Sequence, residues 1–186
     1  ADSRLKYPTS FSGDKREVEL EGEAYFEVQH DDQTPFFVKT SQSTIRVYGT
    51  TFNVKAYSDD SFQKTTLESG SIGLFVDDKE YRLTPNEQAI LNPSKDVKIL
   101  KVDARQQSVW RHGRFLFANE RLEDIMAQLG RWYDVNIFFV GTRARELHFS
   151  GEIDRYEKID KVLRMIELTT NISFSINGKT ITITPE

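Results

Sequence analysis

The sequence predicts an all-β N-terminal domain, either a sandwich or a short β-helix-like stack, followed by a small α+β domain of the order βαβ-βαββ. Apolar and polar residues alternate with period two through much of residues 17–102, and helical spacing begins only after residue 118. The charge balance changes at the same place: residues 1–104 carry 13 Lys and Arg against 18 Asp and Glu, and residues 105–186 carry 12 against 11. We therefore expect two domains, 1–104 and 105–186.

The first predicted domain consists of short strands. Residues 17–28 alternate most clearly, with apolar residues on one face and a row of glutamates on the other: Glu17, Glu19, Glu21 and Glu23. Further extended runs follow at 36–39, 44–48, 52–57, 62–67, 72–76, 80–83, 88–91 and 97–102. Short strands at regular spacing, separated by turn residues, are typical of a sandwich or an open barrel.

The second predicted domain begins with a strand at 113–117. A helical stripe from Leu122 to Tyr133 follows, and Asn119 is its expected N-cap. Apolar residues at 135–140 then predict a second strand. This order is that of a βαβ unit, for which we expect a right-handed crossover and a helix that covers one face of a small sheet.

A second unit of the same kind follows. It starts with a strand at 147–153, and Asp154 with Glu157 predicts a capping box before a helix at 159–166. The chain closes with two alternating strands joined at Asn177-Gly178, a dipeptide favoured where both turn residues need a positive φ.

The sequence contains little that predicts catalysis. Cys is absent, and the histidines, His30, His112 and His148, are far apart in the sequence. No nucleophile elbow, dinucleotide-binding motif or P-loop occurs. We therefore expect no enzyme, no metal and no cofactor. The net charge of −4 argues against a general nucleic-acid binder.

The glutamate row allows three interpretations. Same-face neighbours on a strand lie about 6.5–7 Å apart, a spacing compatible with the about 6.5–9.5 Å between the carboxyls of inverting glycosidases. A regular exposed face provides no pocket to raise a pKa, so we favour a solvated face countered by Lys or Arg on the next strand. Docking of a basic partner is the intermediate interpretation.

The pairs Asp31-Asp32, Asp59-Asp60 and Asp77-Asp78 each follow a strand and predict turns.

Two features of the second domain are candidates for contact with a partner. Arginine predominates there, and Arg143, Arg145 and Arg155 lie around its central connection. The final hairpin, with Ile181 and Ile183 in its last strand, is the other candidate, because an exposed edge strand accepts an added strand.

Several motifs resemble the FecR-type anti-sigma regulators. In the first domain they are 16–28, 35–38, 47–54, 67–70 and 83–89; in the second they are 110–117 and 129–133. The second set is similar to a domain of the Bacteroidetes branch, which resembles the small secretin and TonB-receptor N-terminal fold. Asn86 stands where the family usually has Gly, and we expect the turn to survive because Asn tolerates left-handed backbone.

The resemblance implies the periplasmic sensor of a transmembrane anti-sigma factor, with the first strands of its β-domain trimmed. The implied partner is the signalling domain of a TonB-dependent outer-membrane transporter. The sigma factor is bound by a cytoplasmic segment, and a membrane helix provides the anchor; we expect both outside this sequence, which lacks an initiator Met.

Two other functions stay open. The aromatic residues and the acidic row are compatible with a carbohydrate-binding or hydrolytic β-domain, which predicts exposed Trp or Tyr platforms beside a cleft. A structural β-domain that assembles with itself is the third hypothesis.

Overall fold

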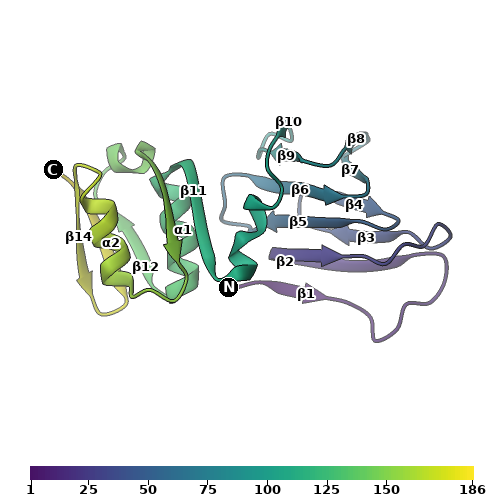
Figure 1. Ribbon diagram of the computed structural model, residues 1–186, viewed down its shortest axis with the longest axis horizontal. Coiled ribbons are helices and arrows are strands. Elements are labelled where there is room, and N and C mark those ends of the chain that lie inside the picture. The colour runs from purple at the N-terminus through teal and green to yellow at the C-terminus, as the bar shows by residue number, and fades with distance from the viewer. The chain divides into compact units, whose positions relative to one another are not determined.

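The computed structural model describes residues 1–186, and the chain divides into two compact units, Ala1–Ser108 and Val109–Glu186 (Figure 1). The first unit is a ten-stranded sheet. Its strands are β1 (Arg4–Lys6), β2 (Arg16–Glu27), β3 (Phe36–Lys39), β4 (Thr44–Val47), β5 (Thr51–Ala56), β6 (Gln63–Ser69), β7 (Ile72–Val76), β8 (Lys79–Leu83), β9 (Glu87–Leu91) and β10 (Val97–Lys101). The prediction of a β-rich N-terminal part is confirmed.

Strand β2 belongs to both layers of this sheet. Its first half pairs in parallel with β3, from Arg16 opposite Phe36, and its second half pairs antiparallel with β5, from Gly22 opposite Ala56. The strand order is β10-β9-β6-β5-β2-β3-β4-β7-β8, with β1 added beside β2. Gly22, at φ +103°, lies where β2 passes from one set of partners to the other.

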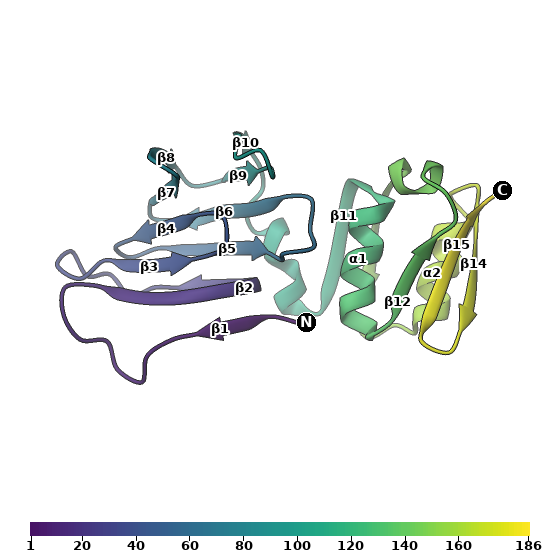
Figure 2. The same cartoon turned by 180° about the vertical axis from the view of Figure 1, so that it is seen from behind.

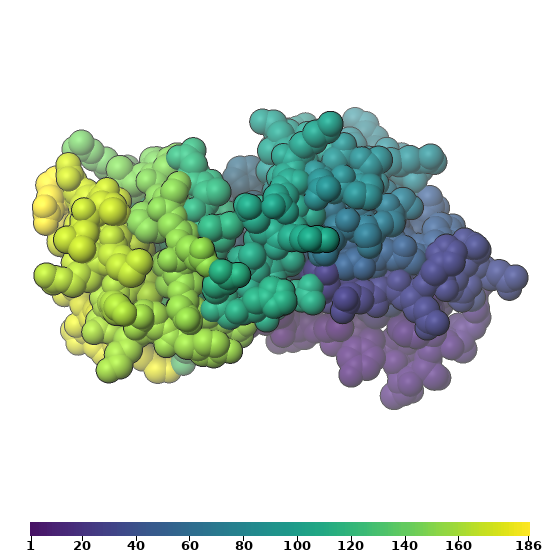
Figure 3. All heavy atoms as spheres, in the orientation of Figure 1, coloured from purple at the N-terminus to yellow at the C-terminus, as the bar shows by residue number.

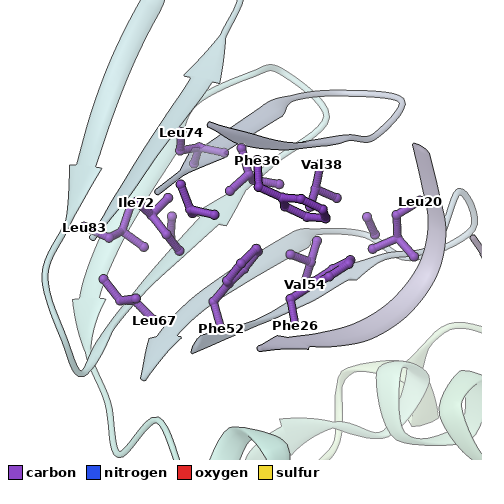
Figure 4. Close-up of a cluster of buried hydrophobic side chains, with 14 of the residues drawn as sticks. Leu20, Phe26, Phe36, Val38, Phe52, Val54, Leu67, Ile72, Leu74 and Leu83 are labelled. Carbon is purple, nitrogen blue, oxygen red and sulfur yellow. The ribbon is translucent and has the colours of Figure 1, made fainter. Parts of the chain in front are cut away.

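The apolar faces of the two layers meet in one core. Figure 4 shows Phe36 and Val38 of β3 pointing toward Phe26 of β2 and Phe52 and Val54 of β5. The rings of Phe26 and Phe52 stack with centroids 5.1 Å apart. The predicted alternation in β2 therefore buries one face and leaves the glutamates on the other.

The second unit contains two helices and five strands after a 3₁₀ turn at Gln106–His112. Its elements are β11 (Arg114–Arg121), α1 (Leu122–Tyr133), β12 (Asn136–Phe139), the 3₁₀ turn η2 (Arg143–Glu146), β13 (His148–Asp154), α2 (Ile159–Glu167), β14 (Ile172–Asn177) and β15 (Thr180–Pro185). This is the predicted α+β composition. The C-terminal end of the chain, yellow in Figure 3, reaches the surface of the unit, where Glu186 is exposed.

The pairing of these strands differs from two βαβ crossovers. β11 pairs antiparallel with β13 in a two-stranded sheet, and β15 lies between β12, its parallel partner, and β14, its antiparallel partner (Figure 2). Each helix therefore carries the chain from one sheet to the other. Both helices bury apolar side chains in one core with strands of both sheets, which explains why neither forms a crossover within a single sheet.

The predicted helix caps are wrong. Asn119 lies within β11 at φ +54°, where a register shift interrupts the pairing with β13, and its N–H donates to Ser150 Oγ at 2.8 Å. Helix α1 begins three residues later without a side-chain cap. Asp154 Oδ1 accepts the N–H of Tyr156 at 2.8 Å, at the end of β13 and not at the start of α2. The Asp154 side chain bonds locally to the backbone, as in turns, and Asn119 lies at the irregularity in β11.

Two predicted turns can also be compared with the structure. Asn177 pairs with Thr180, so the loop of the final hairpin is Gly178-Lys179, one residue later than predicted. Of these two, only Gly178 has a positive φ, +58°, whereas a type I′ turn needs two such residues. Asn86 adopts φ +66°, which confirms that this Asn takes a left-handed conformation.

We expect Gly22→Ala to lower the free energy of unfolding by about 3 kcal/mol, because the strain of a positive φ and a clash with Ser3 add together. A Cβ at Gly22 would also lie 2.5 Å from Ser3 Oγ and 2.7 Å from Ser3 Cα. Gly13→Ala is the matched control: its φ is +94°, but nothing lies within 4 Å of the added carbon. Urea unfolding of both variants measures the difference. Equal losses would contradict a role for the close approach of Ser3 to β2.

Candidate functional site

Three residues of the glutamate row form ion pairs with cations of neighbouring segments. Glu17 lies 2.9 Å from both Lys15 and Lys39, Glu19 lies 3.1 Å from Lys6, and Glu21 lies 3.6 Å from Arg4. Hydrogen bonds from the two lysines hold the pKa of Glu17 below its ordinary value. The predicted solvated face with countering charges is confirmed for these residues. None of them has the unpaired, pocket-bound carboxyl that a general acid requires.

Glu23, the fourth glutamate, lies in a different environment. Its carboxylate accepts a hydrogen bond from Asn53 Nδ2 at 2.8 Å, and burial raises its pKa, against the opposing effect of Lys55. Lys55 itself lies 3.5 Å from Asp60, and these two side chains are only 13% and 10% exposed. The cleft of about 510 Å³ beside the row is lined by Glu19 and Glu21 but not by Glu23. These contacts therefore connect β2 and β5 to the loop that follows β5. None of the four side chains, Glu23, Asn53, Lys55 and Asp60, lines that cleft.

The histidines do not converge. No group of three or more His, Asp or Glu side chains is placed to hold a metal ion. His30 lies beside Asp32, with Nε2 and Oδ2 3.2 Å apart, and both side chains are exposed. The neighbouring Asp31 accepts the N–H groups of Gln33 and Thr34 at 2.9 and 3.1 Å, and hydrogen bonds from Thr34 and Gln33 lower its pKa. This is the turn geometry predicted for the Asp pairs.

The tryptophans are packed and do not form open platforms. Trp110 and Trp132 are both partly buried against the second core. The Arg155 guanidinium lies 3.5 Å from the centre of the Trp132 ring, and Phe115 meets that ring edge-on at 5.8 Å. Trp132 Nε1 donates to the carbonyl of Arg155 at 2.9 Å. The exposed Trp platform that the carbohydrate hypothesis requires is not provided by Trp132.

The structure separates the three candidate arginines by their contacts. Arg155 is held by Trp132 and donates to the carbonyl of Trp110 at 2.9 Å. Arg145 pairs with Glu123 and lies 4.7 Å from the centre of the Phe139 ring. Arg143 is exposed, forms no ion pair and lines a pocket of about 290 Å³ with His148 and Asn171. Of the three, Arg143 alone has a guanidinium available to a partner.

The expectation that the last strand forms an exposed edge is wrong. Ile181 and Ile183 are 0% exposed and lie on β15, the central strand of its sheet. The physical reason is that β12, about forty residues earlier in the chain, pairs with β15 on the side away from β14. The edges of this sheet are β12 and β14. Residues 135–140 were correctly predicted as a strand, but nothing in this uncharged run indicates that β12 pairs with β15.

Both parts of the chain match known families. The FecR protein family matches residues 1–73, and the FecR, C-terminal family matches residues 114–183. The chain belongs to the FecR family of anti-sigma factors. Anti-sigma factors regulate sigma factors, so this FecR-family chain belongs to a sigma-factor-regulating sensor system.

Solved structures resemble this FecR-family chain along nearly its whole length. Two crystal structures of candidate anti-sigma factors from Parabacteroides distasonis ATCC 8503 each share 30% identity with it, with TM-scores of 0.93 and 0.92. The matches cover 99% of this chain and 87% and 86% of those chains. No curated protein matches it significantly. None of its helices has the length and apolar character needed to span a membrane.

We expect Glu23→Gln to remove a pH dependence of stability. Because burial raises the pKa of Glu23 above its ordinary 4.5, the folded state binds this proton more tightly than the unfolded state. The stabilisation is complete below the unfolded pKa and is lost as the pH rises through the folded pKa. Urea unfolding from about pH 4 to about pH 8 should therefore show wild type losing stability relative to the variant as the pH rises. A difference that stays constant, or that grows in favour of wild type, would contradict this account.

Proposed function

We propose that this FecR-family chain is the periplasmic sensor and relay part of a membrane-anchored anti-sigma factor. Its partner is the N-terminal signalling domain of a TonB-dependent outer-membrane transporter, and it acts by binding and not by catalysis. The observation that supports the proposal most is that both units match the FecR family, over residues 1–73 and 114–183. The sigma factor itself is controlled through a cytoplasmic segment and a membrane helix outside these residues.

The contacts of the charged groups agree with a binding role. Glu17, Glu19 and Glu21 are countered by cations, and Arg145 and Arg155 are engaged within the second unit. Catalysis by acid, base or nucleophile needs groups that converge at hydrogen-bond distance around a reacting atom. Glu17, Glu19 and Glu21 are instead each paired with a cation. The net charge of −4 further favours a protein partner over nucleic acid.

Isothermal titration calorimetry tests this proposal. The 186-residue chain is titrated with the purified N-terminal signalling domains of the TonB-dependent transporters of its organism, each tested separately. We expect saturable binding to at least one domain, with a dissociation constant in the micromolar range that is common for transient signalling contacts. The same transporter without its signalling domain is the control and should give no binding.

Two results would contradict the proposal. One is the absence of binding to every signalling domain at high micromolar concentration. The other is saturable binding of a soluble glycan by the isolated chain together with no response to the signalling domains, which would favour the carbohydrate hypothesis.

A further inference from the structure

The outer face of the three-stranded sheet in the second unit carries no charge. Phe139, Ile181 and Ile183 point into the core, so the alternate residues of each strand face outward. We call these residues the uncharged face: Asn136, Phe138 and Val140; Thr180, Thr182 and Thr184; Ser173, Ser175 and Asn177. Phe138 is 60% exposed and Val140 44% exposed. Charged residues make up 29% of the sequence, so nine neighbouring outward positions without one distinguish this face from the rest of the surface.

One edge of this face has unpaired backbone groups. Asn136 N–H donates to Lys179 O at 2.7 Å, and Val140 N–H donates to Ile183 O at 2.8 Å. In a parallel pair every second residue directs its backbone N–H and C=O toward the partner strand, so the backbone groups of Phe138 also point toward β15. The N–H and C=O of Ile137 and Phe139 point away from β15. No side chain bonds to these outward groups. They are the hydrogen-bonding groups that an added strand requires.

The other strand edges carry charge. β1, β8, β10, β11 and β13 are edge strands, and their charged residues include Arg4, Lys6, Lys79, Arg82, Lys98, Lys101, Arg114, Arg121, Glu152 and Asp154. Charged side chains on an edge oppose the addition of a further strand.

β14, at the far side of the same sheet, is uncharged but partly occupied. The N–H of Phe174 donates to Glu167 Oε1 of α2 at 2.7 Å. An added strand would have to displace this carboxylate. β12 therefore combines an uncharged edge with free outward backbone groups, which β14 does not.

We propose that β12 is the docking edge of this chain and receives an extended strand from the partner protein. The added strand hydrogen-bonds to the outward groups of Ile137 and Phe139 and places an apolar side chain beside Phe138. An acidic residue of the added segment pairs with Arg143. This arginine lies shortly after the end of β12 in the chain, and its exposed guanidinium forms no ion pair. The inference rests on the proposed function for the identity of the partner, the transporter's signalling domain.

The charges next to β12 favour a different protein over a second copy of this chain. The acidic residues that flank β12 in the sequence are Asp134 and Glu146. Asp134 pairs with Lys179, and Glu146 pairs with Arg121. A second copy paired through its own β12 would therefore offer Arg143 no free carboxylate from the residues that flank that strand. Addition of a strand from another protein supplies one.

A pair of lysine substitutions tests the proposal in the intact 186-residue chain. Phe138 and Ser175 are both exposed and both lie opposite Thr182, on the two edges of the same sheet. Phe138→Lys places a charge on the proposed docking edge, and Ser175→Lys places the same charge on the other edge. Circular dichroism checks that each variant is folded. Calorimetry with the signalling domain that binds wild type then measures the effect of each.

We expect Phe138→Lys to weaken binding by about tenfold or more, and Ser175→Lys to change it by less than about twofold. Arg143→Glu should weaken binding by about fivefold and reduce its dependence on salt.

If wild type and Phe138→Lys bind the signalling domain equally well, the docking edge is wrong although the proposed function stands. If no signalling domain binds wild type, the proposed function fails and this inference fails with it. Light scattering that shows a wild-type dimer abolished by Phe138→Lys would overturn the proposal in favour of a second copy.

Discussion

The first unit depends on the bend of one strand at Gly22. β2 pairs with β3 in one layer and with β5 in the other, so the strand that bends there is shared by both faces of the core. A positive φ of +103° and the close approach of Ser3 leave no room for a side chain at this position. The core residues of both layers, Phe26, Phe36 and Phe52 among them, pack together because β2 holds the layers in this relation.

Local patterns were sufficient to predict most elements of the fold, but not β1 or the two 3₁₀ turns. The alternation in residues 17–28 and the stripe from Leu122 to Tyr133 depend only on neighbours in the chain, and both became the expected elements. Pairing between distant segments was not predictable in this way. β12 and β15 are separated by about forty residues, and nothing local in either strand specifies that they meet in parallel. The mistaken caps have a similar cause, because the capping preference of Asn119 and Asp154 does not decide whether a helix or a turn follows.

The candidate site was predicted less well than the fold, for a related reason. The number of arginines in residues 105–186 does not indicate which of them reach an internal partner. Folding brings Arg145 to Glu123 and Arg155 to Trp132, and leaves Arg143 exposed. The alternation at Ile181 and Ile183 correctly indicated a strand, but whether a strand is an edge depends on the third strand of the sheet. The uncharged residues around Phe138 identify that edge only once the register of β12 is known.

The account as a whole claims that this chain works by being recognised at a strand edge of its second unit. Amide hydrogen exchange measured by NMR, with and without the bound signalling domain, tests this claim most directly, because exchange reports on each backbone N–H separately. The account predicts that the amides of Ile137 and Phe139 become protected in the complex, while those of β8 and β10 are unchanged. New protection confined to residues 1–108, with Ile137 and Phe139 still exchanging as in the free chain, would contradict it.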